Sequence, residues 1–289
     1  MPIDRPTLEA AIHASGGAQQ PDDQVDGLLA KLQVLEAMGR YGALLKTLVN
    51  VNEKSNFFSF LLEATFAYQF EAAGMPLTYE VKQVSNQSTS IDFRLSAKTG
   101  ESVFFELRLI QQDKGTADDI AKQLAVGSGY AVEKDGEGET VDIFRLQSTI
   151  LSKVQRPNGT PIKFLQTGQG VVNIVVVCIS DILLGAPDAF DCILTMYGDP
   201  AVPAHCRRGV FGLFQDVTTG SPEIHHVHAK KYTHIKKTIH GVLFLFRANE
   251  SGVLDYHLQQ ILVWNRSLVS PEQDEPLTKQ IEAAMPPNR

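Results

Sequence analysis

The feature that most constrains the fold of this chain is an uninterrupted apolar run at residues 171–179. It reads VVNIVVVCI, and Asn173 is its single polar residue. A strand with one face in water alternates apolar and polar residues, whereas a uniformly apolar strand has both faces covered. The run is also far shorter than the roughly 20 residues that a membrane-crossing helix needs. We therefore expect a central strand with helices on both sides of its sheet, and no membrane partner.

The segments before this strand predict what surrounds it. Helical spacing indicates a helix over about 55–73, which Gly74 and Pro76 end. Three strand-like runs follow at 77–84, 90–96 and 102–110, then a polar, glycine-rich stretch at 113–140 and a helix at 141–155. A strand meander followed by a right-handed helical crossover to a parallel strand predicts an α/β fold, with a mixed central sheet flanked by helices.

The two ends of the chain are expected to add to this core. Residues 1–22 suggest an arm or a short helix, and two helices at about 25–38 and 44–51 complete an N-terminal helical cap. After the apolar strand, a helix at 188–196 and strand-like runs at 209–214, 241–247 and 261–265 precede a tail with a short helix. The predicted organisation is a cap at 1–54, a core at 55–180, and an extension of the same sheet at 181–289.

Composition narrows the class of protein. The chain has 289 residues, is 43% hydrophobic and 20% charged, and carries a formal net charge of −7, which excludes a disordered chain. The N-terminus lacks a basic segment followed by an apolar core, so we expect no signal peptide. Three cysteines are too few for a disulfide framework or a zinc knuckle. We expect a soluble, reduced, cytoplasmic protein.

The hairpin at 90–110 contains the first chemical anomaly. A loop over Lys98, Thr99 and Gly100 would pair Ser96 with Ser102. That register sets Asp92 directly opposite Glu106. Like charges at opposed positions of a strand pair are destabilising unless something neutralises them, and a divalent cation would do so.

The two helices that flank the hairpin carry further polar residues on apolar faces. Glu63 lies in a stripe with Phe66 and Phe70, where a carboxylate needs a partner; it could also lie at the stripe edge or pair with Arg94. In the helix at 141–155, Gln147 is near the centre of the apolar face and Lys153 is at its margin. A buried glutamine must hydrogen-bond, either in an ordinary network or in a polar site.

This order of elements and polar residues resembles the PD-(D/E)xK nuclease superfamily, which includes restriction endonuclease-like proteins. The resemblance covers roughly residues 55–180 and implies a restriction endonuclease-like core. The matching pieces are Glu63 in LLEATFAYQFEAAG, Asp92 in SIDFRL, Glu106-Leu107-Arg108 in FFELRLI, and Gln147 in RLQSTILSKV.

What the resemblance implies is Mg²⁺- or Mn²⁺-dependent hydrolysis of DNA phosphodiester bonds. Asp92 and Glu106 would hold the ion, which would polarise the scissile phosphate and lower the pKa of an attacking water. Glu63 would complete the coordination through water or hold a second ion. Gln147 would orient a ligand or the DNA backbone.

The sequence departs from the family pattern at two positions. Arg108 stands where the pattern has lysine, and Ile91 stands where it has proline. Arginine stays protonated and cannot act as a base, although it can stabilise a pentavalent phosphate. Lys153 could supply the missing ammonium if it points inward. The alternative hypothesis is a catalytically inactive nuclease-fold protein that binds nucleic acid or a protein partner.

A basic, histidine-rich region follows the predicted core. Residues 201–247 hold seven basic and two acidic residues, a net charge of +5, with six histidines. This concentration is compatible with a polyanionic partner despite the overall acidic balance. His226 and His228 with His234 or His240 could bind zinc, but their spacing matches no metal motif, which favours solvated histidines.

Overall fold

The expected strands join in one six-stranded sheet with the order β1-β2-β3-β4-β5-β6. The structure is a computed structural model that describes residues 3–15, 20–51, 53–84, 89–111, 114–127, 138–166, 168–181, 187–201, 209–211, 233–248 and 252–288. The strands are β1 (Leu77–Val81), β2 (Ile91–Ser96), β3 (Ser102–Gln111), β4 (Val171–Asp181), β5 (Gly241–Arg247) and β6 (Leu258–Trp264).

The pairing of these strands makes the sheet mixed. Strand β4 pairs in parallel with β3 and with β5, whereas the β1–β2, β2–β3 and β5–β6 pairs are antiparallel. The chain passes from β3 to β4 through helical segments, as the predicted crossover requires. The predicted α/β fold with a mixed, helix-flanked sheet is confirmed, and β5 and β6 continue that sheet.

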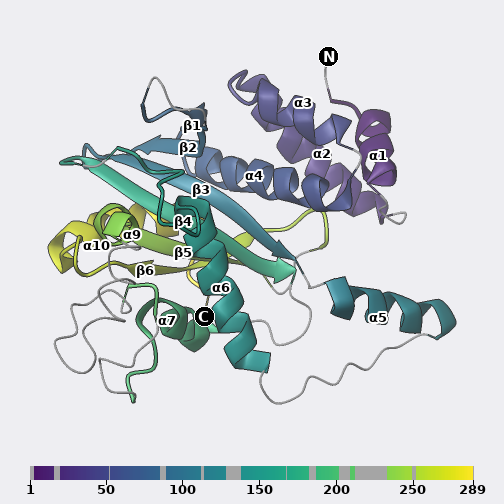
Figure 1. Ribbon diagram of the computed structural model, residues 1–289. Helices are drawn as coiled ribbons and strands as arrows, with labels where there is room; N and C mark the ends of the chain where they lie inside the picture. The colour runs from purple at the N-terminus through teal and green to yellow at the C-terminus, as the bar shows by residue number, and fades with distance from the viewer. Residues whose placement is uncertain are drawn as a thin grey trace.

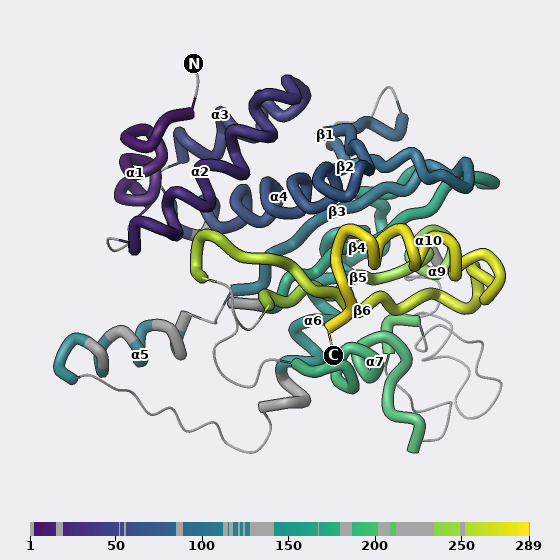
Figure 2. The backbone as a smooth tube through the Cα atoms, turned by 180° about the vertical axis from the view of Figure 1, so that it is seen from behind, coloured from purple at the N-terminus to yellow at the C-terminus, as the bar shows by residue number. Residues whose placement is uncertain are grey.

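Helices cover the sheet on both faces (Figures 1 and 2). One face packs against α4 (Lys54–Ala72) and α10 (Pro271–Ala284). Helices α2 (Asp22–Ala37) and α3 (Gly42–Asn50) lie against α4, and α1 (Arg5–Ala14) lies against α2 and α3. The other face packs against α6 (Gly138–Val154), α7 (Ala189–Tyr197) and α9 (Thr233–Thr238). Helix α5 (Lys114–Val126) lies apart from the sheet in both views.

Strand β4 explains why the apolar run has no alternation. Ile174 and Val176 belong to the core beneath α4, whereas Val175 and Val177 belong to the core beneath α6 and α7. All four side chains are fully buried. The one polar residue of the run, Asn173, is buried too, and its amide donates to the Gln166 and Thr238 carbonyl oxygens at 3.1 and 3.0 Å.

Two local expectations differ from the structure. Residues 209–211 form a turn rather than the start of a strand, because the Val210 and Phe211 N–H groups donate to carbonyl groups of Thr195 and Met196 in α7; residues 212–214 lie outside the described residues. Strand alternation would put Ile91 on the same face as Phe93, but Ile91 packs in the core on the α6 side and Phe93 in the core on the α4 side. Of the helices in the described part, none is long and apolar enough to cross a membrane.

Candidate active site

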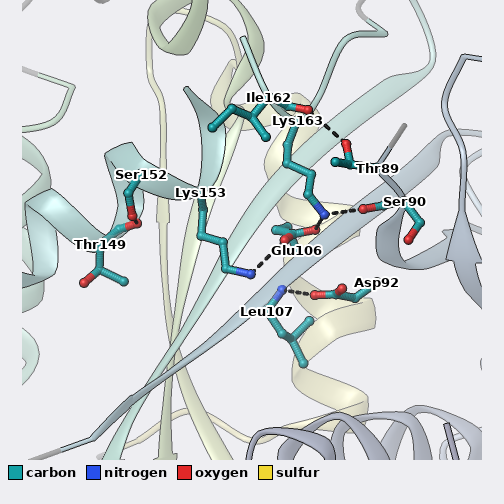
Figure 3. A network of polar contacts seen from close by, with 10 residues as sticks. All are labelled: Thr89, Ser90, Asp92, Glu106, Leu107, Thr149, Ser152, Lys153, Ile162 and Lys163. Atoms are coloured by element: carbon teal, nitrogen blue, oxygen red, sulfur yellow. Dashed lines mark hydrogen bonds and ion pairs between the residues drawn. The ribbon is translucent and has the colours of Figure 1, made fainter. Parts of the chain in front are cut away.

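The site forms where the β2–β3 hairpin opens. Near its turn the predicted register holds, with Ser96 opposite Ser102 and Phe93 opposite Phe105. One step further the Leu107 N–H donates to Asp92 Oδ2 at 2.6 Å (Figure 3). The Asp92 carboxylate thus bonds to the backbone of β3 and lies near enough to Glu106 to be affected by its charge.

Glu106 lies at the centre of the site and is 1% exposed. Its two oxygens are bound by two lysines: Lys153 Nζ lies 2.8 Å from Oε1, and Lys163 Nζ lies 2.9 Å from Oε2. Lys163 Nζ also donates to the Ser90 carbonyl oxygen (Figure 3). A buried carboxylate is tolerated only when its charge is paired and its oxygens are hydrogen-bonded, and these lysines supply both.

The segment that carries Lys163 is fixed on several sides. The Ile162 and Lys163 N–H groups donate to the Val154 carbonyl oxygen, at 2.8 and 3.2 Å. Thr89 Oγ1 donates to the Ile162 carbonyl oxygen at 3.1 Å, and His234 Nε2 of α9 lies 3.0 Å from the Lys163 carbonyl oxygen. Lys163 is therefore held in position by the residues that precede β2, by α6 and by α9.

Glu63 reaches the same cluster from α4. Its Oε2 accepts a hydrogen bond from the Tyr79 hydroxyl of β1 at 2.9 Å, so its bonded partner is Tyr79 rather than Arg94. Burial, together with the negative charge of Asp92, raises the pKa of Glu63 to about 8. Burial and the charge of Glu106 raise the pKa of Asp92 to about 7, against the opposing influence of Lys153.

The net charge of the cluster depends on the protonation of Glu63 and Asp92. Three carboxylates face two ammonium groups, so the fully ionised cluster carries a net charge of −1. Glu63 and Asp92 are partly buried, whereas Glu106 is buried completely.

This electrostatic arrangement predicts that the protein loses stability as pH rises. The pKa values of about 8 and 7 for Glu63 and Asp92 exceed the ordinary 4.5 and 3.8, so the folded state keeps protons that the unfolded state releases. The stability that these retained protons contribute to the folded state is fully present below about pH 4. It is lost as the pH rises to about 7 to 8. Urea unfolding of the wild type should give a lower free energy at pH 8.5 than at pH 5. The Glu63→Gln/Asp92→Asn double variant should flatten this difference, and an unchanged pH profile would contradict the expectation.

The other two predicted residues lie elsewhere. The Arg108 side chain is exposed on β3, and among the contacts between described residues none joins it to the carboxylates. Gln147 is buried, and its Nε2 donates to the Thr195 carbonyl oxygen at 3.2 Å, which links α6 to α7. The structure thus brings together Glu63, Asp92, Glu106 and Lys153 from the expected set.

Sequence reasoning missed Lys163 and Tyr79. Lys163 lies in an irregular segment, where no periodicity indicates the direction of a side chain. Tyr79 could have been found, because strand alternation puts it on the same face as Leu77, beneath α4. Lys153 points into the cluster, which is the condition stated above for it to supply the ammonium that the family pattern places at the position of Arg108.

The carboxylate oxygens of this cluster are chemically suited to bind a hard divalent cation. Carboxylate oxygens are the ligands that Mg²⁺ and Mn²⁺ prefer, and Glu63 and Asp92 are repelling carboxylates that a cation would neutralise. Both oxygens of Glu106, however, are bound by lysines. No group of three or more histidine, cysteine, aspartate or glutamate side chains in the described ranges is arranged to hold a metal ion. An ion at Glu106 would have to replace a lysine.

The histidines and cysteines of the sequence analysis give no second site among the described residues. His226, His228 and Cys206 lie outside them. His240 Nδ1 accepts from the Asn173 N–H at 3.1 Å, and burial lowers the pKa of its imidazole. Cys178 and Cys192 are buried free thiols, and burial raises the pKa of Cys192.

Comparisons with known proteins add no relative. Neither the protein-family models, nor the curated proteins, nor the solved structures contain a match to this chain.

Proposed function

We propose that this protein is a PD-(D/E)xK-like nuclease that hydrolyses DNA phosphodiester bonds with Mg²⁺ or Mn²⁺. The observation that carries the proposal is the convergence of Glu63, Asp92 and Glu106 with Lys153 and Lys163 where the β2–β3 hairpin opens. Five ionisable side chains at one point are unusual in the apolar core of a sheet. Clusters of groups with shifted pKa values are typical of catalytic sites.

The topology supports a restriction endonuclease-like core. Helix α4 precedes the β1–β2–β3 meander, and α6 leads into the parallel strand β4. The acidic residues of the proposed motif lie on α4, β2 and β3, and Lys153 lies near the end of α6. The ammonium that the motif normally places two residues after the glutamate would come from Lys153 and Lys163 instead of Arg108.

Each side chain has a defined part in the proposed reaction. Asp92 and Glu106 would hold the divalent ion, which when bound supplies Lewis-acid activation of the phosphate and of water. Lys163 keeps Glu106 in place. Lys153 can place its ammonium against a phosphate oxygen and stabilise negative charge there. Glu63, oriented by the Tyr79 hydroxyl, can hold a proton near neutral pH and exchange it with water.

Nucleic acid as the partner is supported by the basic helix next to the site. Helix α9 carries Lys236 and Lys237, and His234 of the same helix contacts the segment that holds Lys163. Because phosphate contacts release counterions, the Lys236→Ala/Lys237→Ala variant should weaken DNA binding similarly for all sequences. The slope of log affinity against log salt should become shallower by about 2. Fluorescence anisotropy over a salt series measures this slope, and an unchanged slope would remove α9 from the interface.

A cleavage screen tests the proposed activity. Single-stranded DNA, double-stranded DNA and RNA are incubated with the full chain in Mg²⁺, in Mn²⁺ and in EDTA, with Glu106→Ala as the control. The proposal predicts cleavage of DNA by the wild type that EDTA and Glu106→Ala abolish. Absence of cleavage under every condition, or equal cleavage by the control, would refute it.

One observation favours the alternative, a catalytically inactive nuclease-fold binding module. Both Glu106 oxygens are bound by lysines, so the cluster is already largely neutralised without a metal. A protein of this kind would bind DNA or a protein partner equally well with EDTA and with Mg²⁺, and would cleave nothing. The same screen, combined with a binding assay, separates the two functions.

A further inference from the structure

We propose that Lys153 is a displaceable cation that occupies the metal position on Glu106 until a phosphate group draws it away, while Lys163 stays in place. This inference rests on the proposed function, since it concerns how the same site exchanges an internal cation for a divalent one. This exchange of cations would make metal binding and phosphate binding mutually dependent.

The two lysines differ in how firmly they are held. Lys163 Nζ has two acceptors, Glu106 Oε2 and the Ser90 carbonyl oxygen, and its backbone is fixed by α6 and α9. Lys153 Nζ has one acceptor among the described residues, Glu106 Oε1 at 2.8 Å. The Lys153 side chain is 24% exposed and that of Lys163 is 15% exposed. Lys153 therefore loses one ion pair when its ammonium moves, whereas Lys163 would lose an ion pair and a hydrogen bond.

The position of Lys153 would let its ammonium turn from Glu106 toward solvent. It lies in the last turn of α6, and its flexible four-carbon stem lets the ammonium turn to solvent without a backbone change. A nucleic-acid phosphate that approaches from solvent offers it a second anionic partner. Lys163 remains on Oε2, so Glu106 keeps a neutralising partner while Oε1 becomes available.

The charge balance couples the two events. With both lysines on Glu106 the cluster holds two ammonium groups, and with Lys153 turned to a phosphate it holds one, so its net charge becomes more negative by one. The second state attracts a divalent cation more strongly. By linkage, a bound cation promotes release of Lys153 toward phosphate to the same extent. The resting protein should consequently bind metal weakly in the absence of substrate.

Calorimetric titration of the full chain with Mn²⁺ tests the inference. Lys153→Met removes the competing ammonium, Lys163→Met removes the same charge from the other oxygen, and Lys279→Met, in an exposed pair with Glu275 on α10, controls for net charge. We expect Lys153→Met to bind Mn²⁺ at least about tenfold more tightly than the wild type. The gain for Lys163→Met should be smaller, and Lys279→Met should match the wild type. Thermal unfolding verifies that each variant is folded, and Lys153→Gln replaces Lys153→Met if the latter does not fold.

The outcomes separate this inference from the proposed function. If the wild type binds Mn²⁺ and Lys153→Met binds no more tightly, or if the two site variants gain equally, Lys153 is not the displaceable cation and the nuclease proposal is unaffected. If neither the wild type nor any variant binds Mn²⁺ at millimolar concentration, both the inference and the proposed function are wrong.

Discussion

Replacing Asp92 with asparagine is expected to reduce metal-dependent DNA cleavage by about 10³-fold or more. Asparagine keeps an oxygen that can accept the Leu107 N–H but loses the charge that would hold the cation, so the local backbone should not change. The measurement is the cleavage rate of the wild type and of the variant at saturating Mg²⁺. Equal rates would show that Asp92 is not a metal ligand.

The same substitution should stabilise the protein at pH 8. The pKa of Asp92 is raised from 3.8 to about 7, so its ionised form is disfavoured by up to about 4 kcal/mol, a ceiling that solvent screening lowers. Asp92→Asn removes that cost, whereas Asp92→Ala also removes the acceptor for the Leu107 N–H and serves as the matched comparison. Urea unfolding at pH 8 should rank Asp92→Asn above the wild type. The reverse order would mean that the Asp92 charge is compensated in the folded protein.

Replacing Glu106 with alanine is expected to lower the free energy of unfolding by about 3 to 5 kcal/mol. Glu106 is the common partner of Lys153 and Lys163, and its removal leaves two neighbouring ammonium groups unpaired in a partly buried site. Urea or thermal unfolding of the variant without metal measures this loss. The expectation holds whether or not the protein is a nuclease.

Glu275→Ala is the matched control for this loss of stability. Glu275 pairs with Lys279 on the surface of α10, where both side chains are more than 60% exposed. Exposed pairs contribute little to folding, so this variant should unfold almost like the wild type. A Glu106→Ala variant as stable as Glu275→Ala would show that the lysine contacts do not stabilise the fold.

The main strands and helices were predictable because their sequence patterns are strong. The uniformly apolar residues of β4 required two covered faces, and the loop before Ser102 set the hairpin register. The turn at residues 209–211 was not predictable, because Val210 and Phe211 have strand propensity but hydrogen-bond to the end of α7. Tertiary contacts override propensity in such short segments.

The site was predictable as far as register and helical phase determine it. Strand register placed Asp92 opposite Glu106, and the apolar stripe of α4 identified Glu63 as a residue that needs a partner. The lysine pair was only half predictable: Lys153 lies on a regular helix, whereas Lys163 lies in an irregular segment positioned by contacts with Thr89, Val154 and His234. Gln147 has the expected burial, but whether it faces the site or α7 depends on helix packing that periodicity does not specify.

The most direct test of the proposed metal site is a crystal structure with Mn²⁺ and a bound DNA oligonucleotide, with the ion located by its anomalous scattering. We expect an ion within about 2.0 to 2.6 Å of carboxylate oxygens of both Asp92 and Glu106, with Lys153 Nζ moved away from Glu106 Oε1. Crystals that contain the bound DNA and are equilibrated with millimolar Mn²⁺ but show no ion there, with Lys153 and Lys163 still on Glu106, would contradict this expectation.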